Sequence, residues 1–379
     1  MKNRILIIGG GIAGLTTALA LQQKNIDFRV FEAVDKIRAV GAGITLAGNA
    51  MRVLKELGIA DEVKRQGHLI SSMIIEDEKG MQISIMDAEK LSRKHGLDNV
   101  AIHRAELHQV LLKNIANDKI VTNKKAIDFE EHPGGITIHF DDGSQAEGTA
   151  AIIADGIHSS IRKKLLPQST PRYSGYTCWR GVVENKWHLK QHAVETWGVN
   201  GRFGYVPIGN NQVYWFACKN APYNDQAMSK FKTKELANNF RNYSSPIPQL
   251  IENTYERNLI WSDIVDIKPI SNFAYSRILL IGDAAHATTP NLGQGACIAM
   301  EDAIQAASAI WNQPDNLIDT FRRFQQKRIA RTHFIVNTSY WLGKLAQLEN
   351  KLLIKVRNSL FRVIPTWVNE KQVEKVLDI

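Results

Sequence analysis

Apolar residues occur along this 379-residue chain in two kinds of run, which predict two kinds of sheet. Short runs dominated by apolar residues stand at residues 4–8, 28–31, 151–154 and 278–281. Such runs are typical of strands buried on both faces of a parallel sheet. Residues 173–269 instead alternate apolar and polar side chains in the manner of strands and are rich in aromatics, which predicts an antiparallel sheet. Two shorter stretches, 72–75 and 82–85, alternate in the same way around a turn at Glu78-Lys79-Gly80.

Residues 125–140 predict a β-meander that turns at Pro133-Gly134-Gly135. Much of the remaining chain shows helical periodicity instead. Apolar residues recur every three or four positions in five stretches, which begin at Ile12, Asn49, His103, Gly293 and Trp341. The second stretch ends at Gly58, the fourth near Trp311 and the fifth at Ile364, before Pro365.

The first strand, turn and helix carry a specific spacing of glycines. Gly9, Gly11 and Gly14 follow the first strand, and the second strand ends at Glu32. The first glycine suits a tight turn, the second lets the backbone approach a pyrophosphate, and the third lets helix and strand pack closely. The start of the helix offers N–H groups to phosphate oxygens, and a carboxylate at Glu32 suits ribose hydroxyls. This stretch therefore predicts a dinucleotide site.

Two further apolar strands also end in turns that combine a glycine with an acid. They are Asp155-Gly156 and Gly282-Asp283. Because ligands bind outside the carboxyl ends of parallel strands, we expect all three turns to converge on one crevice. Pro290 and the glycines after it delay the next helix until about Gly293. Its free N–H groups are suited to a polarised or anionic carbonyl-like group.

The fingerprint ending at Glu32, the run 155–162 and the run 282–295 together resemble the single-component flavin-dependent aromatic hydroxylases. The resemblance spans about residues 1–330. It implies an α/β fold: a Rossmann-like FAD-binding domain, an inserted antiparallel β-sheet substrate domain, and C-terminal helices. We expect the FAD-binding domain to comprise residues 1–71, 100–172 and 271–335. The substrate domain then comprises residues 72–99 and 173–270, and a helical region covers 336–379.

The resemblance also implies roles for individual residues. Glu32 would bind the adenine ribose, with Ala33 and the backbone near Ala126 beside the adenine. Arg104 would reach the flavin, Asp283 the ribityl–pyrophosphate part, and Asp155 both FAD and a nicotinamide. The cofactor-binding residues expected on this basis are Gly9, Gly11, Ala13, Gly14, Glu32, Ala33, Arg104, Ala126, Asp155, Asp283, Pro290, Gly293, Gln294, Gly295 and Ala296. The small-residue segment 33–46 is suited to lying flat against a planar ligand.

Within this family the stretches 201–207 and 213–216 look most like the flavin-dependent urate hydroxylases. Those enzymes carry an arginine and a tyrosine on these strands, so the resemblance assigns the catalytic pair to Arg202 and Tyr214 here. A guanidinium can hold an acidic oxo-purine or help deprotonate it, and a tyrosine can hydrogen-bond it. The alternative is that Arg202 is a surface strand residue and Tyr214 a packed aromatic. His286 is expected to be a hydrogen-bonded structural residue, and Cys297 to be packed core.

The activity implied is hydroxylation of a small electron-rich aromatic or heteroaromatic compound, urate-like or phenolic. NADH or NADPH would reduce FAD, and O₂ would react through a flavin C4a-hydroperoxide; no metal is expected. Two alternatives stay open. One is an epoxidase or reductase acting on an isoprenoid or other lipid, and the other is a flavin-binding protein without turnover. The expected oligomeric state is a monomer or a homodimer.

Composition indicates the compartment in which such a protein would work and the partners it would not bind. A hydrophobic content of 44% and a charged content of 22% are ordinary for a globular protein. The three cysteines, Cys178, Cys218 and Cys297, are far apart in the chain and form no C-x-x-C pair, which fits a cytoplasmic protein. The net charge is +9, but residues 322–379 hold 12 Lys and Arg against 4 Asp and Glu. The rest of the chain is thus nearly neutral, which argues against a nucleic-acid surface.

The basic tail has two interpretations. In the helix expected over residues 341–364, four basic residues fall on one line: Lys344, Lys351, Lys355 and Arg362. Leucines and a valine flank that line. A helix lying on a membrane surface has this pattern. A helix packed against the flavin domain with a solvated basic ridge has it too, and this second interpretation is preferred.

Overall fold

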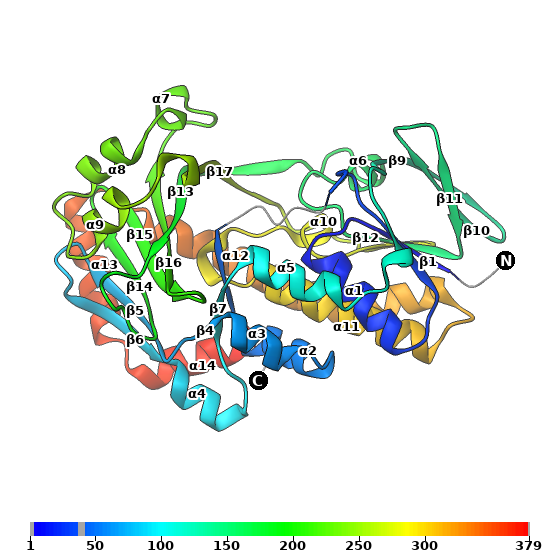
Figure 1. The fold of residues 1–379 in the computed structure, drawn as a ribbon, viewed down its shortest axis with the longest axis horizontal. Helices are drawn as coiled ribbons and strands as arrows, with labels where there is room; N and C mark the ends of the chain where they lie inside the picture. The colour runs from blue at the N-terminus through cyan, green and yellow to red at the C-terminus, as the bar shows by residue number, and fades with distance from the viewer. Residues whose placement is uncertain (1–3, 37–41, 378–379) are drawn as a thin grey trace.

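The parallel sheet forms the centre of one half of the molecule. The structure, a computed structural model, describes residues 4–36 and 42–377 (Figure 1). Strands β1 (Ile5–Ile8), β2 (Phe28–Phe31), β12 (Ala150–Ile153) and β19 (Ile278–Leu280) are parallel, and nearly every side chain in them is buried. Strand β8 (Ile120–Val121) lies at one edge, and the antiparallel β18 (Ala274–Tyr275) at the other. The order β18-β19-β12-β1-β2-β8 places the ends of β1, β12 and β19 side by side.

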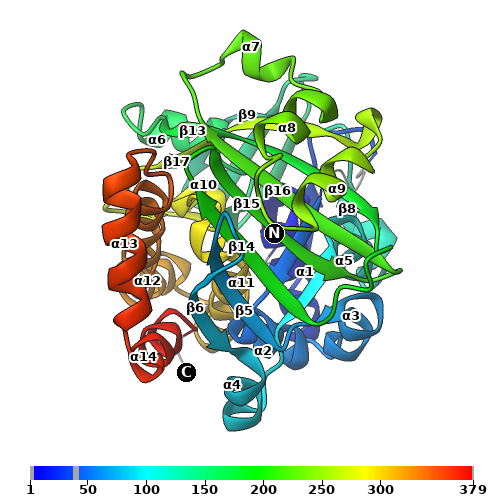
Figure 2. The same ribbon diagram turned by 90° about the vertical axis from the view of Figure 1, so that its left-hand side faces the viewer.

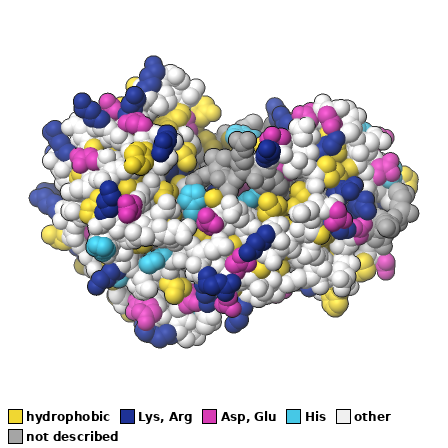
Figure 3. Space-filling model, in the orientation of Figure 1, with side chains coloured by type: hydrophobic (Ala, Val, Ile, Leu, Met, Phe, Trp, Pro, Cys, Tyr) yellow, Lys and Arg dark blue, Asp and Glu magenta, His cyan; other side chains and the backbone are white. Residues whose placement is uncertain are grey.

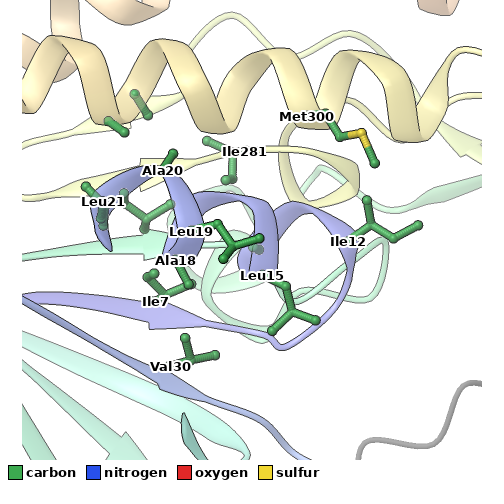
Figure 4. Close-up of a cluster of buried hydrophobic side chains, with 14 of the residues drawn as sticks. Ile7, Ile12, Leu15, Ala18, Leu19, Ala20, Leu21, Val30, Ile281 and Met300 are labelled. Atoms are coloured by element: carbon green, nitrogen blue, oxygen red, sulfur yellow. The ribbon is translucent and has the colours of Figure 1, made fainter. Parts of the chain in front are cut away.

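Helix α1 (Ile12–Gln23) is buried because it lies between this sheet and the long helix α11 (Gly295–Asn312). Figure 4 shows Ile7 and Val30 of the sheet on one side of α1 and Met300 of α11 on the other. Leu15, Ala18 and Leu21 of α1 are completely buried. A helix that is apolar on most of its circumference is suited to such a two-sided environment.

The antiparallel sheet forms the other half of the molecule. Its seven strands run in the order β17-β13-β16-β15-β14-β5-β6, and only β14 and β5 pair in parallel. The sheet thus joins two segments that are distant in sequence. Its strands are β5 (Ser72–Asp77), β6 (Gln82–Asp87), β13 (Pro171–Glu184), β14 (His192–Gly198), β15 (Gly201–Ile208), β16 (Gln212–Asn220) and β17 (Ile260–Ile267).

One face of this sheet packs against two helices, α8 (Thr233–Asn239) and α9 (Ile247–Glu252). Trp179 of β13, Phe203 of β15 and Trp215 of β16 are completely buried on that face. Since successive side chains of a strand point to opposite faces, their neighbours point the other way, toward the parallel-sheet half.

The remaining elements connect the two halves or cover them. A three-stranded meander holds β9 (Ala126–His132), β10 (Gly135–Phe140) and β11 (Gln145–Gly148), as predicted. A second small sheet holds β3 (Gly43–Leu46), β7 (Val100–His103) and β4 (His68–Leu69). The helices are α2 (Gly48–Glu56), α3 (Ala60–Gln66), α4 (Ala88–His95), α5 (Arg104–Lys113), α6 (Ser160–Leu165), α7 (Gln226–Ser229), α10 (Asp283–His286), α12 (Leu317–Ala346), α13 (Lys351–Val363) and α14 (Thr366–Leu377).

The expectation that residues 173–269 alternate throughout as strands is wrong for residues 226–252, which form α7, α8 and α9. Aromatic content suggested strands there, but Leu236, Phe240 and Tyr243 recur at helical spacing and are all buried. The carboxylate of Glu235 accepts a hydrogen bond from the Lys232 backbone N–H at 3.0 Å, which caps the start of α8.

The single tail helix expected over residues 341–364 is also wrong, because α12 ends at Ala346 and α13 begins at Lys351. Asn350 caps the new helix: its side-chain oxygen accepts from the N–H groups of Leu352 at 3.0 Å and Leu353 at 3.1 Å. Helix α13 packs against β6 and β14 of the antiparallel sheet, not against the flavin domain. Figure 2 shows it on the outside of the molecule, alongside α12 and above α14.

Candidate active site between the two sheets

A cavity of about 690 Å³ lies where the ends of the parallel strands meet the free face of the antiparallel sheet. All three predicted turns contribute to it, through Gly11, Gly156 and Asp283. Ten of the predicted site residues line it: Gly11, Ala13, Arg104, Arg202, Tyr214, Asp283, Pro290, Gly293, Gly295 and Ala296. Gly9, Gly14, Glu32, Ala33, Ala126, Asp155 and Gln294 are not among its lining residues. Residues 37–41 of the small-residue segment lie outside the described residues.

The glycine turn after β1 leaves no room for side chains at two positions and leaves open space at a third. Gly9 has φ +107°, and a Cβ there would stand 2.4 Å from the Ala154 carbonyl oxygen. A Cβ on Gly14 would stand 1.9 Å from the Gly9 carbonyl oxygen. Gly11 faces the cavity, and a Cβ on it would meet no protein atom within 4 Å. The backbone of Gly11 is therefore open to a ligand at the N-terminus of α1, as phosphate binding requires.

Glu32 lies at the end of β2, next to the glycine turn. Its carboxylate accepts hydrogen bonds from the backbone N–H groups of Gly10 at 2.6 Å and Val34 at 3.1 Å. These bonds hold the side chain in place, and each oxygen keeps a further acceptor position. Ala33 is exposed beside it, and the Lys124 N–H donates to the Glu32 carbonyl at 2.8 Å. Ala126 follows two residues later but is buried, and its carbonyl accepts from the Ser160 hydroxyl at 2.6 Å.

Asp155 marks the second turn and carries a buried oxygen, Oδ1, that has no hydrogen-bond partner. Burial raises the pKa of this carboxyl to about 6, although the Ser159 hydroxyl and the nearby Arg162 act in the opposite direction. Arg162 is itself 1% exposed and donates from Nη1 to the Ala284 carbonyl at 3.1 Å. It also donates to the Ile157 carbonyl, so it ties the second turn to the third.

The third turn leads through a short helix and a 3₁₀ turn into α11. Asp283 is exposed to the cavity. Gly293 has φ +63° with open space around it, and α11 begins two residues later, without a side-chain cap on its first N–H groups. These groups are therefore free to meet a ligand. The Gln294 side chain points elsewhere, because it accepts from Asn49 at 2.9 Å.

A network of buried charged side chains holds the third turn, at Gly282-Asp283, in place. Asp302 accepts from His286 Nε2 at 2.5 Å, from Arg328 Nε at 2.7 Å and from the Gly282 N–H at 3.0 Å. Burial alone would raise the pKa of Asp302, but His286 and Arg328 outweigh it and hold the pKa at about 2. His286 is 2% exposed and Cys297 is fully buried. Their geometry agrees with the structural roles predicted for both.

The opposite wall of the cavity is built from side chains of the antiparallel sheet. Strand register aligns two rows across β17, β13, β16, β15 and β14. Each row takes one residue from each strand, in that order. The first row is Ile260, Arg180, Phe216, Gly204 and Glu195, and the second is Ser262, Cys178, Cys218, Arg202 and Trp197. Most members of both rows line the cavity. Tyr214, two residues before Phe216 on β16 and on the same face, lines it too.

Arg202 is 2% exposed and is held by three partners. Its Nε donates to Gln347 Oε1 at 3.0 Å, Nη1 to Glu195 Oε1 at 3.0 Å, and Nη2 to Asn291 Oδ1 at 2.8 Å. It is therefore no surface residue. Much of its hydrogen-bonding capacity is used within the protein, so it supports the wall as well as lining it.

Tyr214 lies against Gly43 of β3, where a Cβ on the glycine would stand 2.5 Å from the Tyr214 ring. Burial raises the pKa of Tyr214 well above its ordinary value, and the guanidinium of Arg180 only partly opposes this shift. The phenol therefore stays protonated at neutral pH and can donate a hydrogen bond. Arg180 donates to the Ser262 hydroxyl at 2.8 Å and also lines the cavity.

Sequence reasoning missed Arg180, Glu195 and Phe216 as lining residues. A signal for Arg180 was present, since it lies between Trp179 and Gly181 in an alternating strand and so shares a face with Cys178. The pairing of Cys178 with Cys218 across two strands had no local signal. Both cysteines are free thiols. They lie opposite each other on adjacent strands although they are far apart in the chain.

The residues present fit FAD. Three glycines that line the cavity, Gly11, Gly156 and Gly293, leave open space for a ligand. The unpartnered oxygen of Asp155 and the uncapped start of α11 supply polar groups near it. Within residues 4–36 and 42–377, no cluster of His, Cys, Asp and Glu is arranged to hold a metal ion. In the same ranges, no helix combines the length and apolar character needed to cross a bilayer.

Comparison with curated proteins gives several relatives over most of this chain. The aurachin C monooxygenase/isomerase of Stigmatella aurantiaca is 38% identical, covering 95% of this chain and 94% of the relative. The 2-heptyl-3-hydroxy-4(1H)-quinolone synthase of Pseudomonas aeruginosa is 32% identical, with the same coverage of both chains. An FAD-dependent urate hydroxylase of Klebsiella pneumoniae is 32% identical, covering 88% of each chain.

A solved structure shares the whole architecture. Klebsiella pneumoniae HpxO, complexed with FAD and uric acid, superposes with a TM-score of 0.89 at 27% identity, covering 99% of this chain and 96% of that one. This match confirms the predicted fold class, and the urate hydroxylase relative confirms the predicted resemblance. The family model described as FAD binding domain matches residues 2–324. The chain therefore belongs to the FAD-binding-domain family and is an FAD-dependent oxidoreductase of the monooxygenase type.

Proposed function

We propose that this protein uses NADH or NADPH and O₂ to hydroxylate a heteroaromatic ring of the 4-quinolone type. One oxygen atom of O₂ enters the ring as a hydroxyl group and the other leaves as water, with two electrons from the nicotinamide. Bound FAD supplies the electron transfer and the activation of O₂. The oxygen-activation route expected from the sequence resemblance is part of this proposal, as are the individual cofactor contacts.

One observation favours a substrate with few polar groups. Arg202 and Glu195 are paired with each other at 3.0 Å, and Arg202 also donates to Asn291 and Gln347. Arg180 and Tyr214 are the cavity's remaining side-chain donors on this wall, and Phe216, Cys178 and Ile260 surround them with apolar surface. A 4-quinolone has two polar groups, a carbonyl at C4 and an N–H across the same ring, and hydrocarbon on the rest of its rim. Urate carries polar groups around its whole rim and would bury several of them unpaired.

The two donors also suit the chemistry of such a ring. The protonated Tyr214 can donate to a ring carbonyl, and the positive charge of Arg180 stabilises negative charge that develops on that oxygen. A more anionic carbonyl oxygen raises the electron density on the ring carbon next to the carbonyl carbon, where hydroxylation would occur. The Pseudomonas relative, named a 2-heptyl-3-hydroxy-4(1H)-quinolone synthase, supports the same assignment.

The test is oxidation of NADH and NADPH by the purified FAD-loaded protein with 2-alkyl-4-quinolones, urate and phenols as separate additions. We expect a quinolone to accelerate the oxidation and to give a product heavier by one oxygen. Urate or a phenol turned over in its place would contradict the substrate assignment. Turnover of isoprenoid lipids alone would support the epoxidase or reductase alternative. Retention of FAD without turnover of any compound would support a flavin-binding protein without activity.

A further inference from the structure

Helix α13 exposes a stripe of large apolar side chains. Leu352, Val356, Leu360 and Val363 are 69%, 50%, 59% and 74% exposed. They recur at intervals of four, four and three residues, which places them on one side of an α-helix. Leu353, 51% exposed, lies at the margin of the stripe. These five residues are called the α13 face below.

The α13 face is not the side by which the helix is anchored. The opposite side carries Ile354, Arg357 and Phe361, and it packs on the antiparallel sheet. The Phe361 ring makes an edge contact with Trp197 at 5.6 Å, and the Arg357 guanidinium lies 4.8 Å from the same ring. The helix therefore has two apolar sides, and one of them is left to solvent. Contiguous exposed apolar surface of this kind marks a binding surface.

Charge beside the α13 face indicates what it binds. Lys351 and Lys355 are exposed on one flank of the stripe. The large side chains of Trp341 and Trp367, on the neighbouring helices, are 65% and 58% exposed. A helix with an apolar stripe, flanking lysines and nearby tryptophans is typical of protein segments that lie in the interface of an anionic bilayer.

A second copy of the chain fits this surface less well. A symmetric pair of α13 faces would offer Lys351 and Lys355 no acidic partner on the facing helix, because α13 contains no Asp or Glu. An anionic lipid headgroup supplies one. On the side of the molecule seen in Figure 3, in contrast, basic and acidic side chains are interspersed.

We infer that the α13 face docks this protein on the surface of a membrane rich in anionic lipid. Helix α13 would lie in the plane of the interface with its stripe among the acyl chains and Lys351 and Lys355 at the headgroups. This inference stands on the stripe and its charge, and it does not require the proposed substrate.

The docked helix would also lie close to the cavity. Gln347, between α12 and α13, accepts from Arg202 in the cavity wall at 3.0 Å, and its backbone carbonyl accepts from Asn220 at 3.0 Å. Trp197, which α13 covers, is in the same strand row as Arg202. If the proposed function holds, docking brings the cavity wall close to the compartment in which an alkylated quinolone dissolves.

The test is flotation of the full-length FAD-loaded protein with vesicles of phosphatidylcholine alone or mixed with phosphatidylglycerol. We expect binding to the mixed vesicles. Leu352→Ser/Val356→Ser/Leu360→Ser should abolish it, and Lys351→Gln/Lys355→Gln should weaken it roughly thirtyfold, since each lysine near an anionic surface contributes about 1 kcal/mol. Tyr223→Ser/Tyr255→Ser is the control, because both tyrosines are exposed at 67% and 68% but lie far from α13 in the chain.

All variants change exposed side chains, and FAD content and thermal unfolding would establish that each is folded. Failure of the native protein to bind mixed vesicles would overturn the inference. So would a native dimer that the triple serine variant converts to a monomer, because the occupant would then be a second copy. Turnover of a short-chain quinolone in solution tests the proposed function separately and is expected to survive the triple variant.

Discussion

The two sides of the cavity are built from different materials. The side proposed to hold FAD, called the cofactor side below, is largely backbone: glycine turns, the start of α1 and the start of α11. The side proposed to hold the substrate, called the substrate side, is made of side chains that project from strands, among them Arg180, Tyr214 and Phe216. On the first side a substitution acts through the atoms it adds, because space and N–H groups are what the ligand needs. On the second side it acts through the atoms it removes.

The largest effect is expected beneath the cofactor side, where side chains support the backbone. Asp302→Ala removes a carboxylate that compensates buried Arg328 and His286, both about 2% exposed or less. Arg328 keeps its ion pair with Glu301 at 2.8 Å, but the substitution removes two hydrogen bonds to the Asp302 carboxylate, from Arg328 and from His286. Each hydrogen bond to a charged group is worth about 1.5–3 kcal/mol, so the combined loss is roughly 3 kcal/mol or more. We expect that loss in the free energy of unfolding, measured by urea denaturation with FAD present. Asp315→Ala, at an exposed acid, should leave stability unchanged.

The next effect separates two glycines of the same turn. Gly14→Ala adds a methyl group 1.9 Å from the Gly9 carbonyl, so α1 must move, and both apoprotein stability and FAD affinity should fall. Gly11→Ala meets no protein atom within 4 Å, so the apoprotein should melt at the native temperature. Its FAD affinity should nevertheless fall roughly tenfold, about 1.4 kcal/mol, if the pyrophosphate lies there. Native affinity in Gly11→Ala would place the pyrophosphate elsewhere.

On the substrate side the expected effects fall on turnover and leave FAD in place. Arg180→Gln removes a charged hydrogen bond, worth about 1.5–3 kcal/mol, and Tyr214→Phe a neutral one, worth about 0.5–1.5 kcal/mol. The first should therefore lower kcat/KM for the substrate by at least roughly tenfold, and the second by less. Steady-state kinetics and the flavin absorbance spectrum measure both. Equal kinetics in Arg180→Gln and the native protein would exclude this guanidinium from substrate binding.

The last effect concerns Asp155 and depends on pH. Its pKa is raised from the ordinary 3.8 to about 6, so the folded apoprotein binds more protons than the unfolded chain between these values. Stability contributed by this residue therefore decreases as the pH rises through that window and stays low above it. Asp155→Asn should match the native apoprotein near pH 4 and melt slightly higher above about pH 6. A difference of the same size at every pH would show that titration of Asp155 is not its cause.

The same contrast explains what the sequence could and could not predict. A backbone site needs small residues at fixed local spacing, so Gly9, Gly11 and Gly14 are visible within one short segment. A side-chain wall depends on the register between strands that are distant in sequence. Arg180 and Phe216 face each other only because β13 and β16 pair as they do. Arg202 and Tyr214 were found through family resemblance, and their local sequence alone would also fit a surface strand.

The tail shows a second limit of local patterns. Its basic line and flanking leucines were visible, but the break at residues 347–350 was not, and neither was the sheet on which α13 packs. Which leucines face solvent depends on that contact. The exposed stripe could therefore be identified only in the folded molecule.

The alternation along β13, β15 and β16 has a consequence for how new specificities arise. Trp179, Phe203 and Trp215 maintain the core against α8 and α9, while the residues next to them on their strands face the cavity. Mutations at those neighbouring positions can change what is recognised without altering the packing beneath. Libraries restricted to Cys178, Arg180, Phe216 and Cys218 should therefore yield mostly folded, FAD-containing proteins with altered substrate preference. The same separation offers a route by which one scaffold diversifies among chemically different rings.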